Sequence, residues 1–265
     1  MLQRRWIQIA YPATAKIKIM KTYILGPCSL ESEEVTKKVI DELYPVMVGK
    51  NWYFKGSFDK ANRTSIYSDR GPGLQEGQEI FAWVKNNYPG IKTLTDIHEP
   101  WQAKELHHLI DMIQIPAFLC RQTDLIVEAA TWFNEINVKK GQWLAPQAME
   151  HVVAKIKEVN PNCKVYITER GTSLGYSGLI PDFRAVDILK SFSDGVILDC
   201  THSTQKPKGD TTGGDRELAK KYALAAKIFE YDGVFIETHP DPKNAISDAD
   251  SQVELEWVRS QINNI

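Results

Sequence analysis

Several features that mark other protein classes are scarce in this sequence. Its 265 residues include only four cysteines, Cys28, Cys120, Cys163 and Cys200, and no Cys-x-x-Cys pair. This is too sparse for a disulfide framework in a chain of this size, so we predict a protein of the reducing cytoplasm. No apolar run approaches the roughly 18 residues of a membrane span, and residues 1–19 lack the apolar core of a secretory signal. The sequence therefore predicts no membrane association.

An excess of charge of one sign is also missing. The 32 Lys and Arg residues balance 34 Asp and Glu residues, which gives a formal net charge of -2 at pH 7. Proteins that bind nucleic acids usually carry a clustered basic excess, so we predict no nucleic-acid partner. With 43% hydrophobic and 25% charged residues, the composition is that of an ordinary globular protein. Any cationic site must therefore be local.

No low-complexity tract, internal repeat or linker divides the chain. A length near 250 residues is typical of one (β/α)₈ barrel, so we predict a single catalytic domain at residues 20–265. Residues 1–19 are interpreted as an N-terminal extension. They carry basic but no acidic side chains, so an organelle-targeting segment is an open alternative, as is a true start at Met20.

Short apolar runs with β-forming residues alternate with stretches of helical spacing. In one such stretch, the apolar positions from Val35 to Met47 follow Ser32, a candidate helix N-cap. Regular alternation of strand and helix predicts a parallel sheet, and eight units favour a closed barrel over an open doubly wound sheet. The eight predicted strands are Thr22 to Leu25, Trp52 to Phe54, Ile91 to Leu94, Met112 to Ile115, Ile136 to Val138, Lys164 to Ile167, Gly195 to Leu198 and Gly233 to Ile236.

Nearly every predicted strand ends at a side chain that can perform chemistry. The carboxyl ends of barrel strands converge on one mouth, so these groups should form a single active site. They include Cys28, Lys55, Asp96, Gln114, Lys139, Arg170, His202 and Glu237. An aspartate or an amide at such a position also has a structural alternative, because it can satisfy local hydrogen bonds.

Cations form one subset of these groups. A lone lysine or arginine is usually a solvated surface charge. Several of them at strand ends and in the following loops predict a site for a small ligand with more than one phosphate or carboxylate. The candidates are Lys55, Lys60, Arg63, Arg121, Lys139 and Arg170.

A second subset contains possible metal ligands. Cys28, His202 and Glu237 follow the first, seventh and eighth predicted strands, which are neighbours in a closed barrel. Taken singly, a cysteine or histidine in such a place is more often structural. Together, a thiolate, an imidazole and a carboxylate suit a divalent transition metal.

The segment from Phe54 to Ser65, Phe-Lys-Gly-Ser-Phe-Asp-Lys-Ala-Asn-Arg-Thr-Ser, is the most informative stretch. It resembles the signature of the 3-deoxy-D-manno-octulosonate 8-phosphate synthases, which condense phosphoenolpyruvate with arabinose 5-phosphate. The resemblance runs from about Met20 to the C-terminus. It continues through Gly71-Pro72-Gly73-Leu74, Thr95-Asp96-Ile97-His98-Glu99, Gln114-Ile115-Pro116-Ala117, Arg121-Gln122-Thr123-Asp124, Asn137-Val138-Lys139-Lys140, Glu169-Arg170-Gly171 and Glu237-Thr238-His239-Pro240.

The resemblance implies a (β/α)₈-barrel homotetramer and a role for each matching residue. Lys55, Ser57 and Lys60 would hold the carboxylate side of phosphoenolpyruvate, and Arg121, Lys139 and Arg170 its phosphate region or the neighbouring anion. Arg63 and Thr64 would grip the sugar phosphate, Asn62 would read the sugar hydroxyls, and Arg121 can reach the sugar phosphate of an adjacent subunit. Asp96 and Gln114 would orient cations and substrate. On this basis we assign catalytic work to Lys60, Asn62, Asp96 and His202.

The resemblance also implies a metal centre. One class of the family has a cysteine in the Gly-Pro-Cys position and requires a metal, and Cys28 places this chain in that class. Asp248 matches the fourth ligand of the set Cys28, His202, Glu237 and Asp248, although a helix-capping aspartate is the competing explanation. The implied cofactor is a divalent transition metal, with zinc, iron, manganese and cobalt all open.

Two alternatives remain at this stage. A 3-deoxy-D-arabino-heptulosonate 7-phosphate synthase would use erythrose 4-phosphate, but it typically has Lys-Pro-Arg where this chain has Lys60-Ala61-Asn62-Arg63. A noncatalytic metabolite-binding barrel is the other. Gly56 and Thr64 depart from the common Ala and Ser of the family and retain the needed chemistry. The family's product feeds bacterial lipopolysaccharide or a plant wall polymer.

Overall fold

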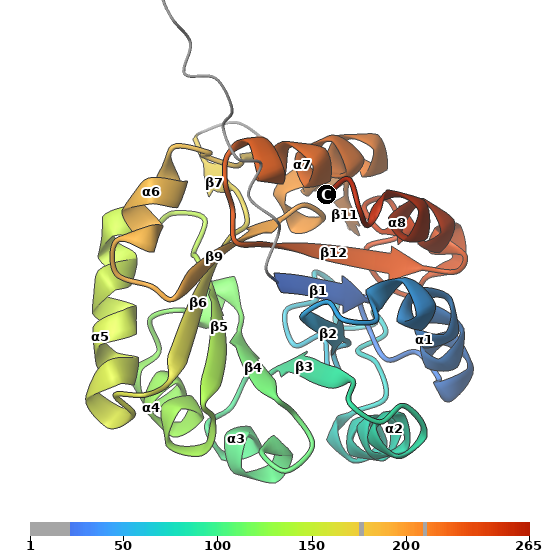
Figure 1. The fold of residues 1–265 in the computed structure, drawn as a ribbon, viewed down its shortest axis with the longest axis horizontal. Coiled ribbons are helices and arrows are strands. Elements are labelled where there is room, and N and C mark those ends of the chain that lie inside the picture. Colours follow the sequence, from blue (N-terminus) through green and yellow to red (C-terminus); the bar gives the residue numbers. More distant parts are fainter. Residues whose placement is uncertain (1–21, 175–177, 209–210) are drawn as a thin grey trace, which may run out of the picture.

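The computed structural model describes residues 22–174, 178–208 and 211–265, so the predicted extension at residues 1–19 lies outside the described part. Eight parallel strands form a closed ring, because the first strand pairs with both the second and the last (Figure 1). The ring consists of β1 (Thr22–Gly26), β2 (Trp52–Lys55), β3 (Lys92–Asp96), β4 (Met112–Ile115), β5 (Glu135–Lys139), β6 (Lys164–Glu169), β9 (Gly195–Asp199) and β12 (Gly233–His239). The predicted barrel and its eight strands are confirmed.

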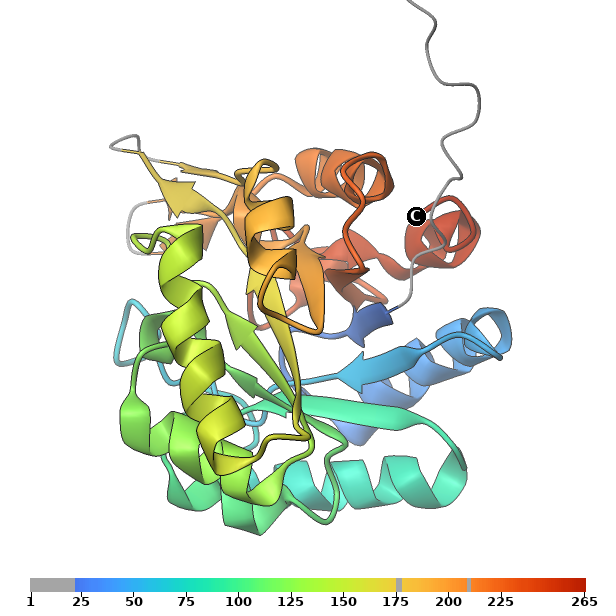
Figure 2. The same ribbon diagram turned by 60° about the vertical axis from the view of Figure 1, so that its left-hand side comes forward.

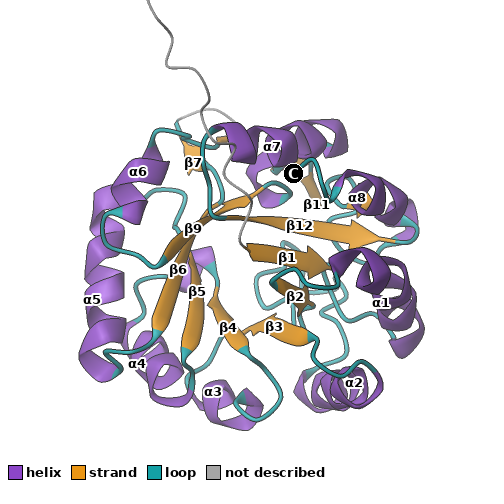
Figure 3. Ribbon diagram, viewed as in Figure 1, coloured by secondary structure: helices purple, strands orange, loops and turns teal. Residues whose placement is uncertain are grey.

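Helices cover the outside of the ring, as Figure 3 shows in purple around orange strands. They are α1 (Glu33–Met47), α2 (Leu74–Asn87), α3 (Trp101–Leu106), α4 (Thr123–Trp132), α5 (Glu150–Val159), α6 (Ala185–Lys190), α7 (Arg216–Ile228) and α8 (Leu255–Gln261). Helix α1 begins as predicted, because the side chain of Ser32 accepts a hydrogen bond from the Val35 backbone N–H at 3.2 Å. None of the helices in the described part of the chain combines the length and the apolar character that spanning a bilayer requires.

Small additional elements decorate the loops after the later strands. Two antiparallel pairs are formed by β7 (Thr172–Ser173) with β8 (Leu179–Ile180) and by β10 (Lys206–Lys208) with β11 (Thr211–Gly213). Strand β13 (Val253–Glu254) pairs with β12. Figure 2 shows the side of the barrel, where α5 lies along the outside of the strands.

Because side chains alternate along the strands, the barrel has one hydrophobic core inside the ring and another outside it, and the polar site lies at the mouth of the ring. Side chains alternate between the inside of the ring and the helix layer. Ile24, Tyr53, Leu94, Met112, Ile197 and Phe235 form a small cluster inside the ring, while a larger cluster lies between strands and helices. Two residues after an inward apolar side chain, five strands place a polar one on the same face, namely Lys55, Asp96, Gln114, Asp199 and Glu237. The floor of the barrel is therefore apolar and its mouth polar.

Candidate active site

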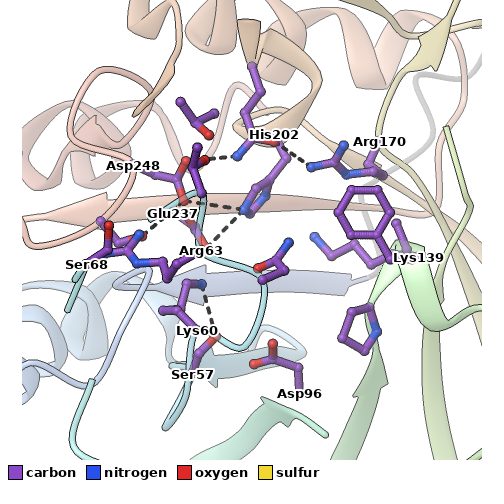
Figure 4. Close-up of a pocket in the computed structure, with 18 of the residues that line it drawn as sticks. Ser57, Lys60, Arg63, Ser68, Asp96, Lys139, Arg170, His202, Glu237 and Asp248 are labelled. Carbon is purple, nitrogen blue, oxygen red and sulfur yellow. Dashed lines mark hydrogen bonds and ion pairs between the residues drawn. The ribbon is translucent and has the colours of Figure 1, made fainter. Parts of the chain in front are cut away.

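A cavity of about 670 Å³ opens at the carboxyl ends of the strands, where the sequence predicted the active site. Figure 4 shows Glu237, Asp248 and His202 gathered on one side of it, with Lys139 and Arg170 on the other. Thirteen of the predicted site residues line this cavity: Lys55, Ser57, Lys60, Asn62, Arg63, Thr64, Asp96, Gln114, Lys139, Arg170, His202, Glu237 and Asp248.

Two predicted site residues do not line the cavity. Cys28 is fully buried behind it, where its Sγ lies 3.1 Å from Asp248 Oδ2. Arg121 is exposed two residues before α4 begins, and it is not among the described residues that line the cavity. Cys28 therefore reaches the site through its contact with Asp248, whereas Arg121 lies outside the cavity of its own chain. The role of Arg121 toward an adjacent subunit stays a prediction.

The predicted metal ligands converge. One donor atom each from Cys28, Glu237 and Asp248 lies within 4.8 Å of the others. His202 stands beside this group, with its Nε2 at 3.5 Å from Glu237 Oε1 and 4.0 Å from Asp248 Oδ2. The other carboxylate oxygen of Glu237, Oε2, is buried and has no hydrogen-bond partner among the described residues. A buried carboxylate oxygen left without a donor, beside sulfur and imidazole, fits a bound divalent cation.

Asp248 does not cap a helix. The next helix, α8, begins at Leu255 and has Glu254 as its N-cap residue. Asp248 instead sits in a turn with φ of 49°, a left-handed conformation that is uncommon for a residue with a side chain. The competing explanation for Asp248 from the sequence is therefore wrong, and its carboxylate points at the other donors.

The protonation states of these donors follow from their surroundings. Burial raises the pKa of the Cys28 thiol, and the Glu237 carboxylate raises it further. Burial also pushes the pKa of Asp248 upward, but His202 and Lys60 outweigh that effect and hold it below its ordinary value. The thiol therefore keeps its proton and shares it with an ionised Asp248. A divalent cation would compete with that proton for the sulfur.

His202 is oriented by a buried carboxylate. Its Nδ1 lies 2.9 Å from Asp199 Oδ2, and its backbone N–H donates to Asp199 Oδ1 at 2.8 Å. Asp199 also binds the ammonium group of Lys139. Burial raises the pKa of Asp199, but the nearby His202 and Lys139 outweigh it and lower the pKa overall. A carboxylate behind an imidazole fixes which ring nitrogen faces the metal donors, as is common at metal sites.

Lys55 lies beneath the metal donors. Its Nζ donates to Glu237 Oε1 at 2.6 Å and to the Cys28 carbonyl at 2.7 Å, and its side chain is buried. Lys60 lies nearer the opening and donates to the Cys28 carbonyl and to Ser57 Oγ. Lys55 therefore neutralises Glu237, while Lys60 and Ser57 form the wall that an anionic substrate would meet. Direct contact between Lys55 and substrate stays a prediction.

Polar side chains from the middle strands complete the floor of the mouth. His98 Nε2 lies 3.3 Å from Asp96 Oδ2, while Asp96 Oδ1 has no hydrogen-bond partner among the described residues. Gln114 accepts a hydrogen bond from Asn137, which in turn accepts one from Thr168. Asp96 Oδ1 is thus a buried acceptor without a donor among the described residues, and Gln114 is held by its neighbours.

The residues predicted to bind the sugar phosphate lie at the rim. Asn62 and Thr64 are exposed and line the cavity. Arg63 donates to the Asp69 carbonyl, to Ser247 Oγ and to the Ile246 carbonyl. Its guanidinium thus ties the loop after β2 to the loop that carries Asp248. A sugar phosphate at this rim would meet an arginine that is already oriented.

Sequence reasoning missed some residues of the site. Asp199 stands at the end of β9, the seventh strand of the ring, and that position could have indicated a partner for His202. Gln205 and Phe235 line the cavity and carried no signal, since a glutamine in a loop and a phenylalanine in a strand are common everywhere.

The chain is similar to known proteins over most of its length. A family model described as the DAHP synthetase I family matches residues 19–263. A relative from Helicobacter hepaticus named 2-dehydro-3-deoxyphosphooctonate aldolase is 45% identical over 243 residues, which cover 86% of this chain and 89% of the relative. A relative of the same name from Fusobacterium nucleatum is 42% identical over 236 residues, or 88% and 84% of the two chains. The chain belongs to the 2-dehydro-3-deoxyphosphooctonate aldolase family.

Membership in this family confirms the resemblance seen in the sequence motifs, because this aldolase name denotes the same group as 3-deoxy-D-manno-octulosonate 8-phosphate synthase. A third relative with this name, from Geobacter metallireducens, is 44% identical over 237 residues. The relatives are named as enzymes, which supports a catalytic barrel over the noncatalytic alternative. They are also named for an octonate, so the heptulosonate synthase alternative is not favoured.

Proposed function

We propose that this chain condenses phosphoenolpyruvate with D-arabinose 5-phosphate and water, which gives 3-deoxy-D-manno-octulosonate 8-phosphate and inorganic phosphate. The observation that carries the proposal is the gathering, in one cavity, of Lys60, Lys139 and Arg170 beside a cluster of metal donors. These cations suit two anionic substrates, and the family's name supplies the substrate class.

The cations divide the cavity into regions. Lys60 and Ser57 receive the carboxylate of phosphoenolpyruvate on one side, and Lys139 and Arg170 receive its phosphate on the other. Arg170 Nη1 is buried and has no hydrogen-bond partner among the described residues, so it is available to a phosphate oxygen. Holding two like-charged substrates in contact turns a bimolecular encounter into an oriented one, which supplies a large part of the rate enhancement.

The carbon–carbon bond forms when C3 of the enolpyruvyl group attacks the aldehyde carbon of the sugar phosphate. Water adds at C2, and the resulting tetrahedral intermediate expels inorganic phosphate. Asn62 and the free oxygen of Asp96 bind the sugar hydroxyls, while Arg63 and Thr64 bind its phosphate at the rim. The cations stabilise the charge that develops on the oxygen atoms.

Cys28, His202, Glu237 and Asp248 would hold a divalent cation, because their donor atoms converge and one Glu237 oxygen lacks a partner. Such a cation supplies Lewis acidity toward an oxygen atom of substrate or water. Asp199 holds His202 in place, and Lys55 offsets the charge of Glu237. The proposal extends to a cytoplasmic homotetramer in which Arg121 reaches the site of an adjacent subunit.

The test is phosphate release from phosphoenolpyruvate with arabinose 5-phosphate or erythrose 4-phosphate, measured before and after chelation and metal restoration. We expect turnover with arabinose 5-phosphate that is lost to the chelator and regained with metal. Preference for erythrose 4-phosphate would overturn the sugar assignment. Turnover that the chelator leaves unchanged would overturn the metal assignment. Absence of turnover under all conditions would overturn the proposal that the chain is an enzyme.

A further inference from the structure

One side chain bridges the anion side and the metal side of the cavity. Gln205 Oε1 accepts a hydrogen bond from Arg170 Nη2 at 2.7 Å, and Gln205 Nε2 donates to Asp248 Oδ1 at 2.8 Å. Arg170 and Asp248 lie on opposite sides of His202 in Figure 4. Gln205 therefore connects, through two hydrogen bonds, the arginine proposed to bind phosphate and the aspartate proposed to bind the metal.

The orientation of the Gln205 amide is determined by its two partners. A guanidinium group can only donate hydrogen bonds, and an ionised carboxylate can only accept them. The amide oxygen must face Arg170 and the amide nitrogen must face Asp248, because a flipped amide would lose both hydrogen bonds. Gln205 also ends the short helical turn His202–Thr204, and its backbone N–H donates to the His202 carbonyl. The bridge is thus anchored beside a predicted metal ligand.

On the anion side, the bridge fixes the guanidinium plane of Arg170. Nη2 is occupied by Gln205, while Nη1 is buried without a partner among the described residues. Only 7% of the Arg170 surface is exposed, so that surface faces the cavity rather than bulk solvent. An arginine held in this way presents a fixed donor to a phosphate and loses little rotational freedom when the phosphate binds.

On the metal side, the bridge fixes the carboxylate of Asp248. Oδ1 is occupied by Gln205, which leaves Oδ2 facing Cys28 Sγ and His202 Nε2. The backbone of Asp248 has φ of 49°, a conformation that only surrounding contacts maintain in a non-glycine residue. A hydrogen bond to one oxygen therefore directs the other oxygen toward the metal donors.

We propose that Gln205 is a positioning residue that couples anion binding at Arg170 to cation binding at Asp248, so that each ligand tightens the binding of the other. The inference rests on the proposed metal-dependent function and adds a residue to it. Thermodynamic linkage requires the coupling to be reciprocal. Part of any coupling comes from direct attraction between anion and cation, so the contribution of Gln205 is the part that its substitution removes.

The experiment measures cadmium affinity of the metal-free full chain with and without saturating inorganic phosphate. Cadmium is a suitable probe because its bond to the Cys28 thiolate gives an ultraviolet absorbance signal that requires no turnover. Gln205→Met preserves side-chain volume and removes both hydrogen bonds, while Gln205→Glu keeps the acceptor toward Arg170 and removes the donor toward Asp248. Gln75→Met, on an exposed position of α2, is the matched control.

We expect phosphate to tighten cadmium binding in the wild type and in the Gln75→Met control. In both Gln205 variants the tightening should fall by about fivefold, the effect of roughly one hydrogen bond. Wild-type tightening in a folded Gln205→Met chain, checked by its thermal melt, would overturn the inference. If wild-type turnover nevertheless required metal, the proposed function would stand and only the role assigned to Gln205 would be wrong. Wild-type turnover that did not require metal would overturn both the proposed metal-dependent function and this inference.

Discussion

Replacing Lys140 with methionine should destabilise the barrel by about 3–5 kcal/mol, the usual cost of removing one partner from a buried ion pair. Lys140 and Glu169 are both fully buried, and Lys140 Nζ lies 3.3 Å from Glu169 Oε2. The lysine also donates to the Gly141 and Leu144 carbonyls and to Thr172 Oγ1, each at 3.2 Å. The substitution leaves a buried carboxylate and three acceptors without their cation.

The expected loss depends on pH. Burial raises the pKa of Glu169, with Lys140 opposing that effect, so loss of Lys140 raises the pKa further. The loss in free energy of unfolding caused by Lys140→Met is therefore small in acid, where the Glu169 carboxyl is protonated. It grows as pH rises through the pKa of Glu169 in the folded state. The deficit of Lys140→Met should therefore be larger at pH 8 than at pH 5.

Thermal unfolding of the two chains provides the assay. A loss of 3–5 kcal/mol corresponds to a fall in Tm of roughly 6–20 °C for a domain of this size class. Lys37→Met is the control, because it breaks an exposed pair with Asp41 on α1 and should cost at most about 1 kcal/mol. A Lys140→Met chain as stable as the control at pH 8 would refute the reasoning. The double variant Lys140→Met with Glu169→Gln should lose less than the sum of the single losses.

Three further predictions concern the active site. Cys28→Asn should lower metal affinity more than about tenfold, measured as metal content after dialysis, with the buried Cys163→Ala as control; unchanged metal content would contradict the ligand role. Burial, opposed by Asp199, lowers the pKa of Lys139 to about 8, so kcat/KM for phosphoenolpyruvate should fall as pH rises above about 8 and the free enzyme loses this positive charge. Lys139→Arg keeps the charge and should move that fall to higher pH, and an unmoved profile would exclude Lys139 as its source. Asn62→Ala should raise KM for arabinose 5-phosphate about fivefold, the value of one hydrogen bond, and leave KM for phosphoenolpyruvate unchanged; equal effects on both substrates would argue against a sugar contact.

Much of the site could be predicted because barrel geometry converts sequence position into spatial position. Lys55, Asp96, Lys139 and Glu237 each stand at a strand end, and closing the ring brings those ends together. The prediction for Cys28 and Glu237 depended on the neighbouring places of the first and last strands, and the pairing of β1 with β12 bears this out. Family resemblance added roles that position alone could not supply.

The contacts among these residues were not predictable in the same way. Arg63 points to the loop of Ser247 rather than to open solvent, and Gln205 reaches from the turn after His202 to Arg170 and Asp248. Each contact depends on the side-chain rotamer and on where a long loop returns. Neither the rotamer nor the path of a loop produces a periodic pattern in the sequence.

The sequence by itself determined the alternation of strands and helices, because apolar spacing and helix caps are local properties that each segment carries. It also determined which residue types stand at the mouth. Only the tertiary structure decided which of these charges neutralise one another, as Lys55 does for Glu237 and Lys139 for Asp199. Lys55 and Glu237 are 182 positions apart, on β2 and β12, and closure of the ring through β1 brings these strands near each other. Lys139 and Asp199 are 60 positions apart, on β5 and β9, which pair with opposite sides of β6.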